Sequence, residues 1–303
     1  MSSSISGESS VSPNKFKKST TPTILRIIVS IYIYMMIILA VIFGFITQVT
    51  FWILLFPYLL TNEYFKIKIM GMAFRFWCNL LVVWLNPFWK VVIVRNPPKS
   101  YKPRRTILMS NHLSSADPWI ICSSHFPWEL KYVYKADLIK IPIVGWVVQM
   151  TYDMPIYFTG DKSGWGVKSG TTQLLFKRCT ELQEIGFGQV VFPEGTRSKL
   201  RRLQPFRNGF FRFAIENKCE ILPVVMHNNW TCWPLGETLM DIGTIYVAYG
   251  DPIKLTEDTN IEELKEIVKN SMLDLLKYCP TYNPELEQPI SRMASSRGHG
   301  IIG

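Results

Sequence analysis

A long apolar segment near the N-terminus constrains the fold of this chain more than any other feature. Residues 24–60 carry a single charged side chain, that of Arg26. One straight helix of this length would measure about 55 Å, whereas the hydrocarbon core of a bilayer is about 30 Å thick. We therefore expect the segment to break or bend, at residues 44–50 and at Pro57. It would form a membrane hairpin, or one span followed by an interfacial helix.

Positive charges lie on both sides of the apolar segment. Because basic residues are retained on the cytosolic side of membranes, this arrangement places both ends in the cytosol and favours the hairpin. A second apolar stretch, residues 67–85, contains Arg75. It is predicted to be an amphipathic helix on the membrane or on the folded domain, or else a further span. The flanking charges are those of Lys15, Lys17, Lys18, Arg26, Lys66, Lys68 and Arg75.

The rest of the chain follows an α/β pattern from about residue 90 onwards. Short β-branched runs predict strands, and apolar residues three or four apart predict helices. The predicted strands are residues 91–94, 106–110, 189–192, 221–225 and 244–249. The predicted helices are residues 118–126, 166–185, 209–217 and 260–279, the last with Thr259 and Glu262 as a capping box.

These patterns divide the chain into four parts. Residues 1–23 are rich in Ser, Thr and Lys and predict a disordered tail. Residues 24–62 form the membrane hairpin, or the span plus interfacial helix. Residues 63–280 form the α/β domain, and residues 281–303 form a loose tail. A chain of 303 residues is long enough for one sizeable domain with such an appendage.

Net charge and cysteine spacing limit the classes of partner and site. The formal charge of +10 suits anionic lipid headgroups or an anionic substrate. No zinc-ligand spacing, helix-turn-helix signature or aromatic RNA-binding motif occurs, so nucleic acid is not expected as a partner. The six scattered cysteines predict buried free thiols in a reducing compartment. They and the four histidines suggest no metal site, and nothing in the sequence indicates an oligomeric state.

The first candidate site runs from Asn111 to Asp117, after the strand predicted at residues 106–110. Neutral imidazole accepts protons near pH 7, so His112 could remove the proton of a substrate hydroxyl. A carboxylate on the other ring nitrogen would fix the tautomer, which is a role for Asp117. The alternative is structural: Asp117 precedes Pro118 and could cap a helix, with His112 an ordinary loop residue.

The second candidate site is residues 192–198, F-P-E-G-T-R-S, at the end of another predicted strand. A turn rich in small residues can hold a charged group close to backbone amides. Arg197 offers a planar fork for phosphate. The alternative is a surface turn with a solvated basic run. Further positive charges nearby are those of Lys199, Arg201 and Arg202.

The two candidate sites belong to an ordered series of motifs. N-H-x-x-x-x-D is followed by F-P-E-G-T-R-S and then by the L-P-V-V strand, Leu222 to Val225. Other motifs are Lys135, Leu138, Pro142 with Gly145, Phe206 to Gly209, and Tyr246 to Ile253. Over residues 85–280 the series resembles the glycerolipid acyltransferases, in particular the 1-acyl-sn-glycerol-3-phosphate (lysophosphatidic acid) acyltransferase family, in which a membrane helix pair precedes the domain.

This resemblance implies a fold and a reaction. The fold is an α/β domain with a mixed sheet. The reaction moves a fatty acyl group from acyl-CoA, or from acyl carrier protein in some members, to the sn-2 hydroxyl of lysophosphatidic acid. The product is phosphatidic acid, and acyl-CoA is a co-substrate, with no cofactor needed. The expected location is the endoplasmic reticulum membrane, with the active site facing the cytosol.

The resemblance also implies roles for the site residues. His112 is the general base and Asp117 orients it. The substrate hydroxyl attacks directly, so no serine nucleophile is required, and the chain has no G-x-S-x-G elbow. The residues implied in phosphate binding are Glu194, Gly195, Thr196 and Arg197. The supporting residues are Asn111, Arg207 and Pro223, the last in a motif linked to the acyl donor or to the integrity of the site.

One position departs from the family pattern and leaves the acceptor open. Phe158 and Thr159 stand where the second motif usually has an arginine, so Lys162 or Arg207 would have to supply that charge. The alternative acceptors are another lysophospholipid, glycerol 3-phosphate, or a phospholipid in a transacylation. Outside this reaction, the alternatives are a non-catalytic membrane scaffold and a basic lipid-binding module.

The sequence also contains one N-glycosylation sequon, Asn229-Trp230-Thr231. We expect it to stay unmodified, because the domain is predicted to face the cytosol. A gel shift on endoglycosidase treatment, abolished by Asn229→Gln, would contradict that orientation.

Overall fold

A mixed seven-stranded sheet organises the domain. The computed structural model describes residues 19–99, 101–158, 170–255 and 259–287, and within them the strand order is β1-β7-β6-β2-β5-β3-β4. Neighbouring strands run parallel, apart from the antiparallel pair β6 and β7. The strands are β1 (Trp89–Arg95), β2 (Thr106–Ser110), β3 (Lys131–Lys135), β4 (Met154–Ile156), β5 (Gln189–Val191), β6 (Glu220–His227) and β7 (Gly243–Tyr249). The predicted mixed α/β fold is confirmed.

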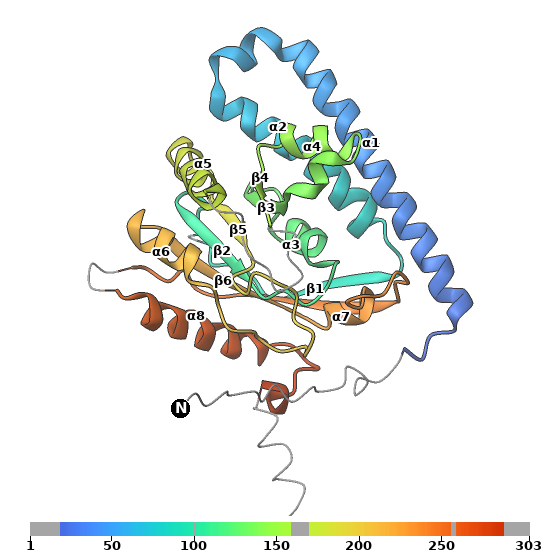
Figure 1. The fold of residues 1–303 in the computed structure, drawn as a ribbon. Coiled ribbons are helices and arrows are strands. Elements are labelled where there is room, and N and C mark those ends of the chain that lie inside the picture. The colour runs from blue at the N-terminus through green and yellow to red at the C-terminus, as the bar shows by residue number, and fades with distance from the viewer. Residues whose placement is uncertain (1–18, 100, 159–169, 256–258, 288–303) are drawn as a thin grey trace, which may run out of the picture.

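Helices cover both faces of this sheet (Figure 1). They are α1 (Thr23–Thr61), α2 (Glu63–Trp77), the π-helix η2 (Cys78–Trp84) that continues α2, α3 (Asp117–His125), η3 (Ala136–Lys140), α4 (Val144–Met150), α5 (Thr171–Ile185), α6 (Asn208–Glu216), α7 (Asn229–Cys232), α8 (Ile261–Leu276) and η4 (Pro284–Glu287). The predicted strands and helices are present, except that residues 166–169 of the helix predicted at 166–185 lie outside the described residues. The unpredicted elements β3, β4, α4 and α7 are short, and short segments carry a weak periodic signal.

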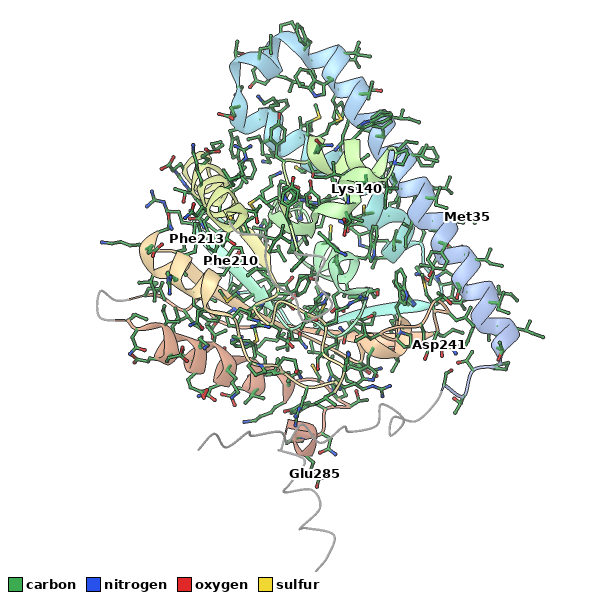
Figure 2. All side chains as sticks on the ribbon, viewed as in Figure 1. Met35, Lys140, Phe210, Phe213, Asp241 and Glu285 are labelled. Carbon is green, nitrogen blue, oxygen red and sulfur yellow. The ribbon has the colours of Figure 1, made fainter. Side chains whose placement is uncertain are left out.

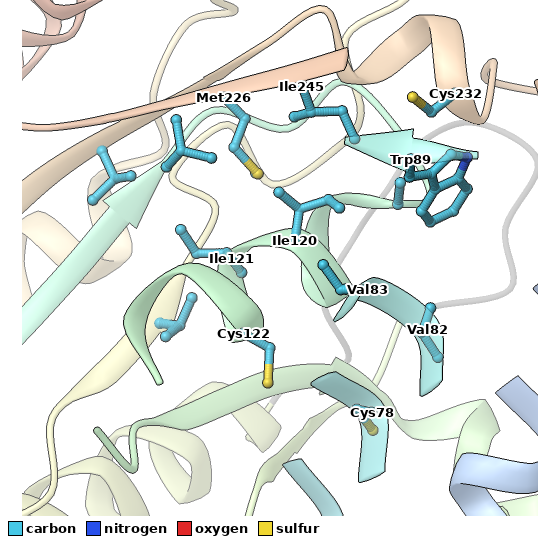
Figure 3. Packing of buried hydrophobic residues seen from close by; sticks show 14 of the residues in the cluster. Cys78, Val82, Val83, Trp89, Ile120, Ile121, Cys122, Met226, Cys232 and Ile245 are labelled. Atoms are coloured by element: carbon cyan, nitrogen blue, oxygen red, sulfur yellow. The ribbon is translucent and has the colours of Figure 1, made fainter. Parts of the chain in front are cut away.

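The alternation of side chains along β2 explains the two layers of helices. Leu108 packs in a core shared with α1, η2 and α3, whereas Ile107 and Met109 pack in a second core under α5, α6 and α8. Figure 3 shows part of the first core, where Ile120 and Ile121 of α3 lie between the sheet and η2. A central parallel strand buried on both faces has an apolar interior, as residues 107–109 of β2 do. The six cysteines are free and buried, as predicted.

Helix α1 corrects the predicted break in the apolar segment. It is one helix of 39 residues that passes through residues 44–50 and through Pro57, which lies close to its C-terminal end. The bilayer thickness does not set its length, because its N-terminal part packs along the domain. Arg26 pairs with Asp241 at 3.5 Å, and Ser30 accepts a hydrogen bond from Met240 N–H at 2.7 Å. The outer side of α1 stays exposed, as at Met35 (Figure 2).

A hairpin forms, but not within residues 24–62 as predicted: its arms are α1 and the α2–η2 segment, with the turn at Asn62 (Figure 1). The Asn62 side chain caps α2 by accepting the Phe65 N–H at 2.9 Å. Trp77 ties the arms together, since its Nε1–H donates to Thr47 Oγ1 at 2.9 Å. Both arms are long and apolar enough to cross a membrane. α1 is mostly exposed, whereas more than half of the apolar part of the second arm is buried.

Two arginines that were counted as flanking charges have buried carboxylate partners instead. Arg26 pairs with Asp241, and Arg75 Nη2 lies 2.6 Å from Asp153 Oδ1. Because these charges are neutralised inside the protein, neither supports the predicted orientation in a membrane. Lys66 and Lys68 lie within α2, just after the turn, and so do not flank the hairpin, and the basic residues before residue 19 lie outside the described residues.

A smaller correction concerns the start of α8. Its N-cap is Asn260, whose side chain accepts the Glu263 N–H at 2.8 Å, while Asn260 Nδ2 donates to the Glu263 carboxylate. The reciprocal capping box therefore lies one residue later than the predicted pair, Thr259 and Glu262.

Candidate active site

The two candidate motifs meet at one edge of the sheet. Strands β2 and β5 are parallel neighbours, with Met109 opposite Val191. The loops that follow them therefore leave the sheet at the same carboxyl-terminal edge, where open α/β sheets bind ligands. The backbone of His112 joins them directly. Its N–H donates to Glu194 Oε1 at 2.9 Å, and its carbonyl accepts the Ser198 N–H at 2.7 Å.

His112 and Asp117 form the hydrogen-bonded pair that the sequence predicted. His112 Nδ1 lies 2.7 Å from Asp117 Oδ2. An ionised carboxylate only accepts, so the proton is assigned to Nδ1 and the lone pair to Nε2. The imidazole stacks on the Phe192 ring at 4.1 Å and is 19% exposed. None of the described residues hydrogen-bonds Nε2, so this nitrogen is open to a substrate.

The Asp117 carboxylate is fully buried and is surrounded by donors. Its Oδ2 also accepts the N–H groups of Leu113 at 2.7 Å and Ser114 at 2.9 Å, and its Oδ1 accepts Asn229 Nδ2–H at 2.5 Å. Asp117 is therefore not an N-cap, because its side chain turns back onto the loop. Ala116 is the N-cap of α3. The loop is folded around this carboxylate.

Asn111 at the start of the loop bonds the neighbouring strand β6, which also contains Pro223. The Asn111 side chain donates to Met226 O at 2.9 Å and accepts Met226 N–H at 2.8 Å, which extends the pairing of β2 and β6 beyond the last ladder residue. Pro223 is buried in β6 opposite Met109. Its carbonyl accepts the Gly250 N–H at 2.8 Å just past the end of β7. Proline has no N–H to donate, but the β6–β7 ladder ends at the next residue, Val224, so the ladder loses no hydrogen bond at Pro223.

The turn after β5 requires a glycine. Gly195 has φ +72°, a conformation that L-residues with a side chain rarely adopt. Its N–H donates to Phe192 O at 3.0 Å and closes the turn. A Cβ at Gly195 would lie 3.3 Å from Arg207 Cγ, so the Arg207 side chain covers this turn. Gly195 and Arg207 are exposed, and Thr196 is half-buried.

Glu194 corrects one predicted phosphate ligand. Its buried carboxylate accepts the N–H of His112 through Oε1 and the N–H of Gln204 through Oε2 at 3.0 Å. A carboxylate used in this way would repel a phosphate rather than bind it. Glu194 instead ties the His112 loop to the turn after β5 and to residue 204.

Arg197 lies beside the His112 loop, because its Nη1–H donates to Ser115 Oγ. The guanidinium is half-buried, and Lys199 nearby is exposed. Of the candidates for the missing second-motif charge, Lys162 and the neighbouring Thr159 lie outside the described residues, and Arg207 lies over Gly195. Among the described residues, no group of three or more His, Cys, Asp and Glu could hold a metal ion.

Asn229 is the site residue that the sequence interpretation missed. It was noted only as a sequon, yet its amide is fully buried against Asp117. Because the amide is buried in the folded protein, the absence of a glycan would not by itself establish the orientation of the chain, whereas a gel shift would still contradict it. A usable signal was available, because Asn229 follows the L-P-V-V strand and therefore leaves the sheet at the same edge as His112.

Comparisons with known proteins agree with this geometry. The Acyltransferase family description matches residues 91–227. The chain is 27% identical over 220 residues to a chloroplastic 1-acyl-sn-glycerol-3-phosphate acyltransferase of Brassica napus, covering 71% of this chain and 60% of that relative. It is 31% identical over 185 residues to the 1-acyl-sn-glycerol-3-phosphate acyltransferase of Saccharomyces cerevisiae, covering 58% of each. The chain thus spans about three fifths of the length of these relatives.

A solved structure shares the fold. The 1-acyl-sn-glycerophosphate (LPA) acyltransferase PlsC of Thermotoga maritima superposes with a TM-score of 0.60 at 18% identity, covering 86% of this chain and 99% of that one. The motifs, the sheet that brings them together and the matched residues lead to one conclusion. Residues 91–227 of the chain form a domain that matches the Acyltransferase family.

Proposed function

We propose that this protein transfers a fatty acyl group from acyl-CoA to the sn-2 hydroxyl of lysophosphatidic acid and so makes phosphatidic acid. The observation that carries the proposal is the His112–Asp117 pair with Nε2 left open. The relatives whose names state this reaction support the choice of acceptor.

The chemistry follows from the tautomer of His112. Nε2 takes the proton of the glycerol hydroxyl while the hydroxyl oxygen attacks the thioester carbonyl. The carbon–sulfur bond then breaks, the thiolate leaves, and the imidazolium returns the proton to the sulfur. Asp117 holds Nδ1–H and stabilises the imidazolium that forms in between. No covalent acyl-enzyme is needed, so the site requires a base and an oriented hydroxyl only.

Arg197 is proposed to bind the phosphate of the acceptor. Its guanidinium lies beside the loop that carries His112, and the planar fork matches phosphate oxygens. Glycerol phosphate held there would keep its hydroxyl close to the base. Phe158 stands where the second motif usually has an arginine, so one expected phosphate contact is missing. An acceptor whose phosphate is held less tightly should therefore be tested as well.

Membrane attachment through the hairpin is part of this proposal. The outer side of α1 exposes Ile24, Ile27, Ile31, Ile38, Ile53 and Leu54, which are 42% to 74% exposed. An apolar surface of this extent is costly in water and suits lipid, and both lipid substrates reside in a membrane. An endoplasmic reticulum location and a cytosolic site remain predictions, because some relatives are chloroplastic.

The experiment that tests the proposal is acyl transfer by membranes that express the chain. Radiolabelled acyl-CoA is offered with lysophosphatidic acid, lysophosphatidylcholine or glycerol 3-phosphate, beside membranes without the chain. Labelled phosphatidic acid from lysophosphatidic acid would support the proposed reaction. Product only from another acceptor would keep the chemistry and change the substrate. No transfer from acyl-CoA or from acyl carrier protein to any acceptor would contradict the proposal and favour a scaffold or a lipid-binding module.

A further inference from the structure

Asn229 occupies a position behind the catalytic pair that the acyltransferase motifs do not include. It is the first residue of α7, directly after β6. Strand β6 is the parallel neighbour of β2 on the side opposite β5, so its end reaches the same edge of the sheet as the His112 loop. The Asn229 side chain is fully buried, and its Nδ2–H donates to Asp117 Oδ1 at 2.5 Å.

The orientation of the Asn229 amide follows from its neighbour. A flipped amide would place its oxygen against Asp117 Oδ1, so the amino group must face the carboxylate. Its oxygen Oδ1 is then buried, and none of the described residues hydrogen-bonds it. A buried acceptor without a partner costs folding free energy, and such costs gather at functional sites. The Asn229 amide thus donates a hydrogen bond to Asp117 while its own oxygen stays unpaired, so its position favours the Asp117 contact over folding stability.

We propose that Asn229 is a positioning residue for the acyl transfer. The inference rests on the proposed function and extends it to a residue outside the recognised motifs. Asn229 holds Asp117 Oδ1, which leaves Oδ2 aimed at His112 Nδ1. It supplies a donor without a second charge, so the imidazole is the one titratable hydrogen-bond partner of this carboxylate among the described residues. The His112 ring is thereby kept with Nδ1 protonated and Nε2 ready as the base.

The charged groups around this contact are few among the described residues. Glu194 accepts the His112 N–H at 2.9 Å, and Arg197 donates to Ser115 Oγ of the same loop. His112 lies on the same loop as Asp117 and hydrogen-bonds it. His227 belongs to β6, where its ring packs edge-on against Trp230 at 4.8 Å, and it has no hydrogen bond to Asp117. The Arg201 guanidinium lies over the same Trp230 ring, 5.6 Å from its centroid. A pH effect of changing Asn229 is therefore expected to act through Asp117 and His112.

The test compares Asn229→Leu with the wild type, because leucine is similar in size and lacks the donor. We expect kcat to fall on the order of 10- to 100-fold, with the KM for lysophosphatidic acid unchanged. In the plot of kcat/KM against pH, the acidic limb should move to higher pH. Without the donor, the Asp117 carboxylate interacts more strongly with the protonated imidazole, so the base becomes free only at higher pH.

A double-mutant cycle separates positioning from structure. In an Asp117→Asn background, Asn229→Leu should cause no further loss of kcat, because the carboxylate on which it acts is gone. The matched control is Thr231→Val in the same short helix. Its hydroxyl donates to Asn228 O at 2.7 Å, so the change disturbs α7 without touching Asp117, and kcat and the pH limb should stay unchanged.

The outcomes are distinct. Equal losses from Asn229→Leu in the wild-type and Asp117→Asn backgrounds, or a lower kcat without movement of the acidic limb, would overturn the positioning role. If Asn229→Leu does not fold, as judged by thermal unfolding in detergent micelles, Asn229→Ala removes the donor without added bulk and carries the same expectations. Failure of the proposed function would be seen separately, as absence of acyl transfer in the wild type.

Discussion

Two buried polar clusters in this molecule differ in whether they leave a ring nitrogen accessible to a substrate. The active-site cluster is His112, Asp117 and Asn229, and it leaves His112 Nε2 without a partner among the described residues. The second, which we name the hairpin cluster, is made of Arg75, Glu129, Lys131, Asp153 and the neighbouring His125 with Tyr132. Both clusters bury carboxylates against donors, but only the first leaves a reactive nitrogen accessible.

The hairpin cluster joins the second arm of the membrane hairpin to the domain. Arg75 of α2 lies 2.6 Å from Asp153 and 3.1 Å from Glu129, while Lys131 lies 2.7 Å from Glu129. Lys131 Nζ also donates to the carbonyls of Thr151 at 2.8 Å and Ile67 at 3.1 Å. Burial raises the pKa of Glu129 and lowers that of Lys131. Charges paired in this way join α2 of the hairpin to the domain, and we expect them to act on stability.

The two histidines show the same contrast at single-residue scale. His125 hydrogen-bonds Trp128 O through Nδ1 at 3.0 Å and Tyr132 Oη through Nε2 at 2.6 Å. Both ring nitrogens are occupied, and burial lowers the pKa of His125 to about 3. His112 has one nitrogen occupied and one open. An accessible ring nitrogen therefore distinguishes His112, the proposed base, from His125.

Asp117→Asn should give the largest effect among the changes that break this contrast. Four donors surround the carboxylate, and an asparagine would turn an amino group toward some of them. The His112 tautomer would no longer be held, so kcat should fall by on the order of 10²-fold or more, with KM little changed. Steady-state kinetics on protein of verified folding checks this. A variant within threefold of the wild type would contradict the role of Asp117.

Arg75→Leu should instead act on stability. Removing the arginine leaves Glu129 and Asp153 buried without their main partner, which costs about 3–5 kcal/mol, or on the order of 10 °C in Tm. The kcat per folded molecule should be unchanged. Thermal unfolding in detergent micelles measures the effect. The control is Arg178→Leu, which breaks a half-exposed pair with Glu181 and should cost under about 1 kcal/mol. Equal effects of the two changes would contradict the comparison.

Arg197→Ala should sharpen the comparison within the active site, because it changes binding rather than chemistry. We expect the KM for lysophosphatidic acid to rise about 10-fold or more, with kcat little affected. Arg212→Ala on the exposed side of α6 serves as the control and should change neither value. A lower kcat at unchanged KM would assign Arg197 a different role.

His125→Gln should give the smallest effect, visible only in acid. The folded-state pKa of His125 lies below its ordinary value, so its neutral form contributes stability above about pH 6.5 that is lost as pH falls toward 3. Glutamine keeps hydrogen-bonding groups and does not titrate. The Tm of the variant should therefore fall less than that of the wild type between pH 7 and pH 4. Parallel pH dependences would show that His125 does not carry this sensitivity.

The parts of the fold that the sequence predicted are those with strong local signals. The β-branched run at residues 106–110 became β2 without a shift, and the motif order placed His112 and Asp117 correctly at the end of it. Parallel strands then bring their following loops together, so the second motif could be expected near the first. Local pattern and sheet geometry agree here.

The missed features depend on contacts between distant segments. The length of α1 follows from partners such as Met240 and Asp241, which no periodicity within the helix reveals. The role of Glu194 depends on backbone N–H groups that no side-chain pattern reports. Asn229 was missed because its amide reaches Asp117 only once β6 lies beside β2, a pairing of distant segments.

The most direct test of the account is acyl transfer to lysophosphatidic acid by His112→Ala beside the wild type, at equal amounts of folded protein. The open Nε2 of His112 is the claimed base, so kcat should fall by on the order of 10²–10⁴, with the unfolding temperature preserved. A variant that keeps more than a tenth of the wild-type rate would show that the proton leaves by another route, and the central claim would fail.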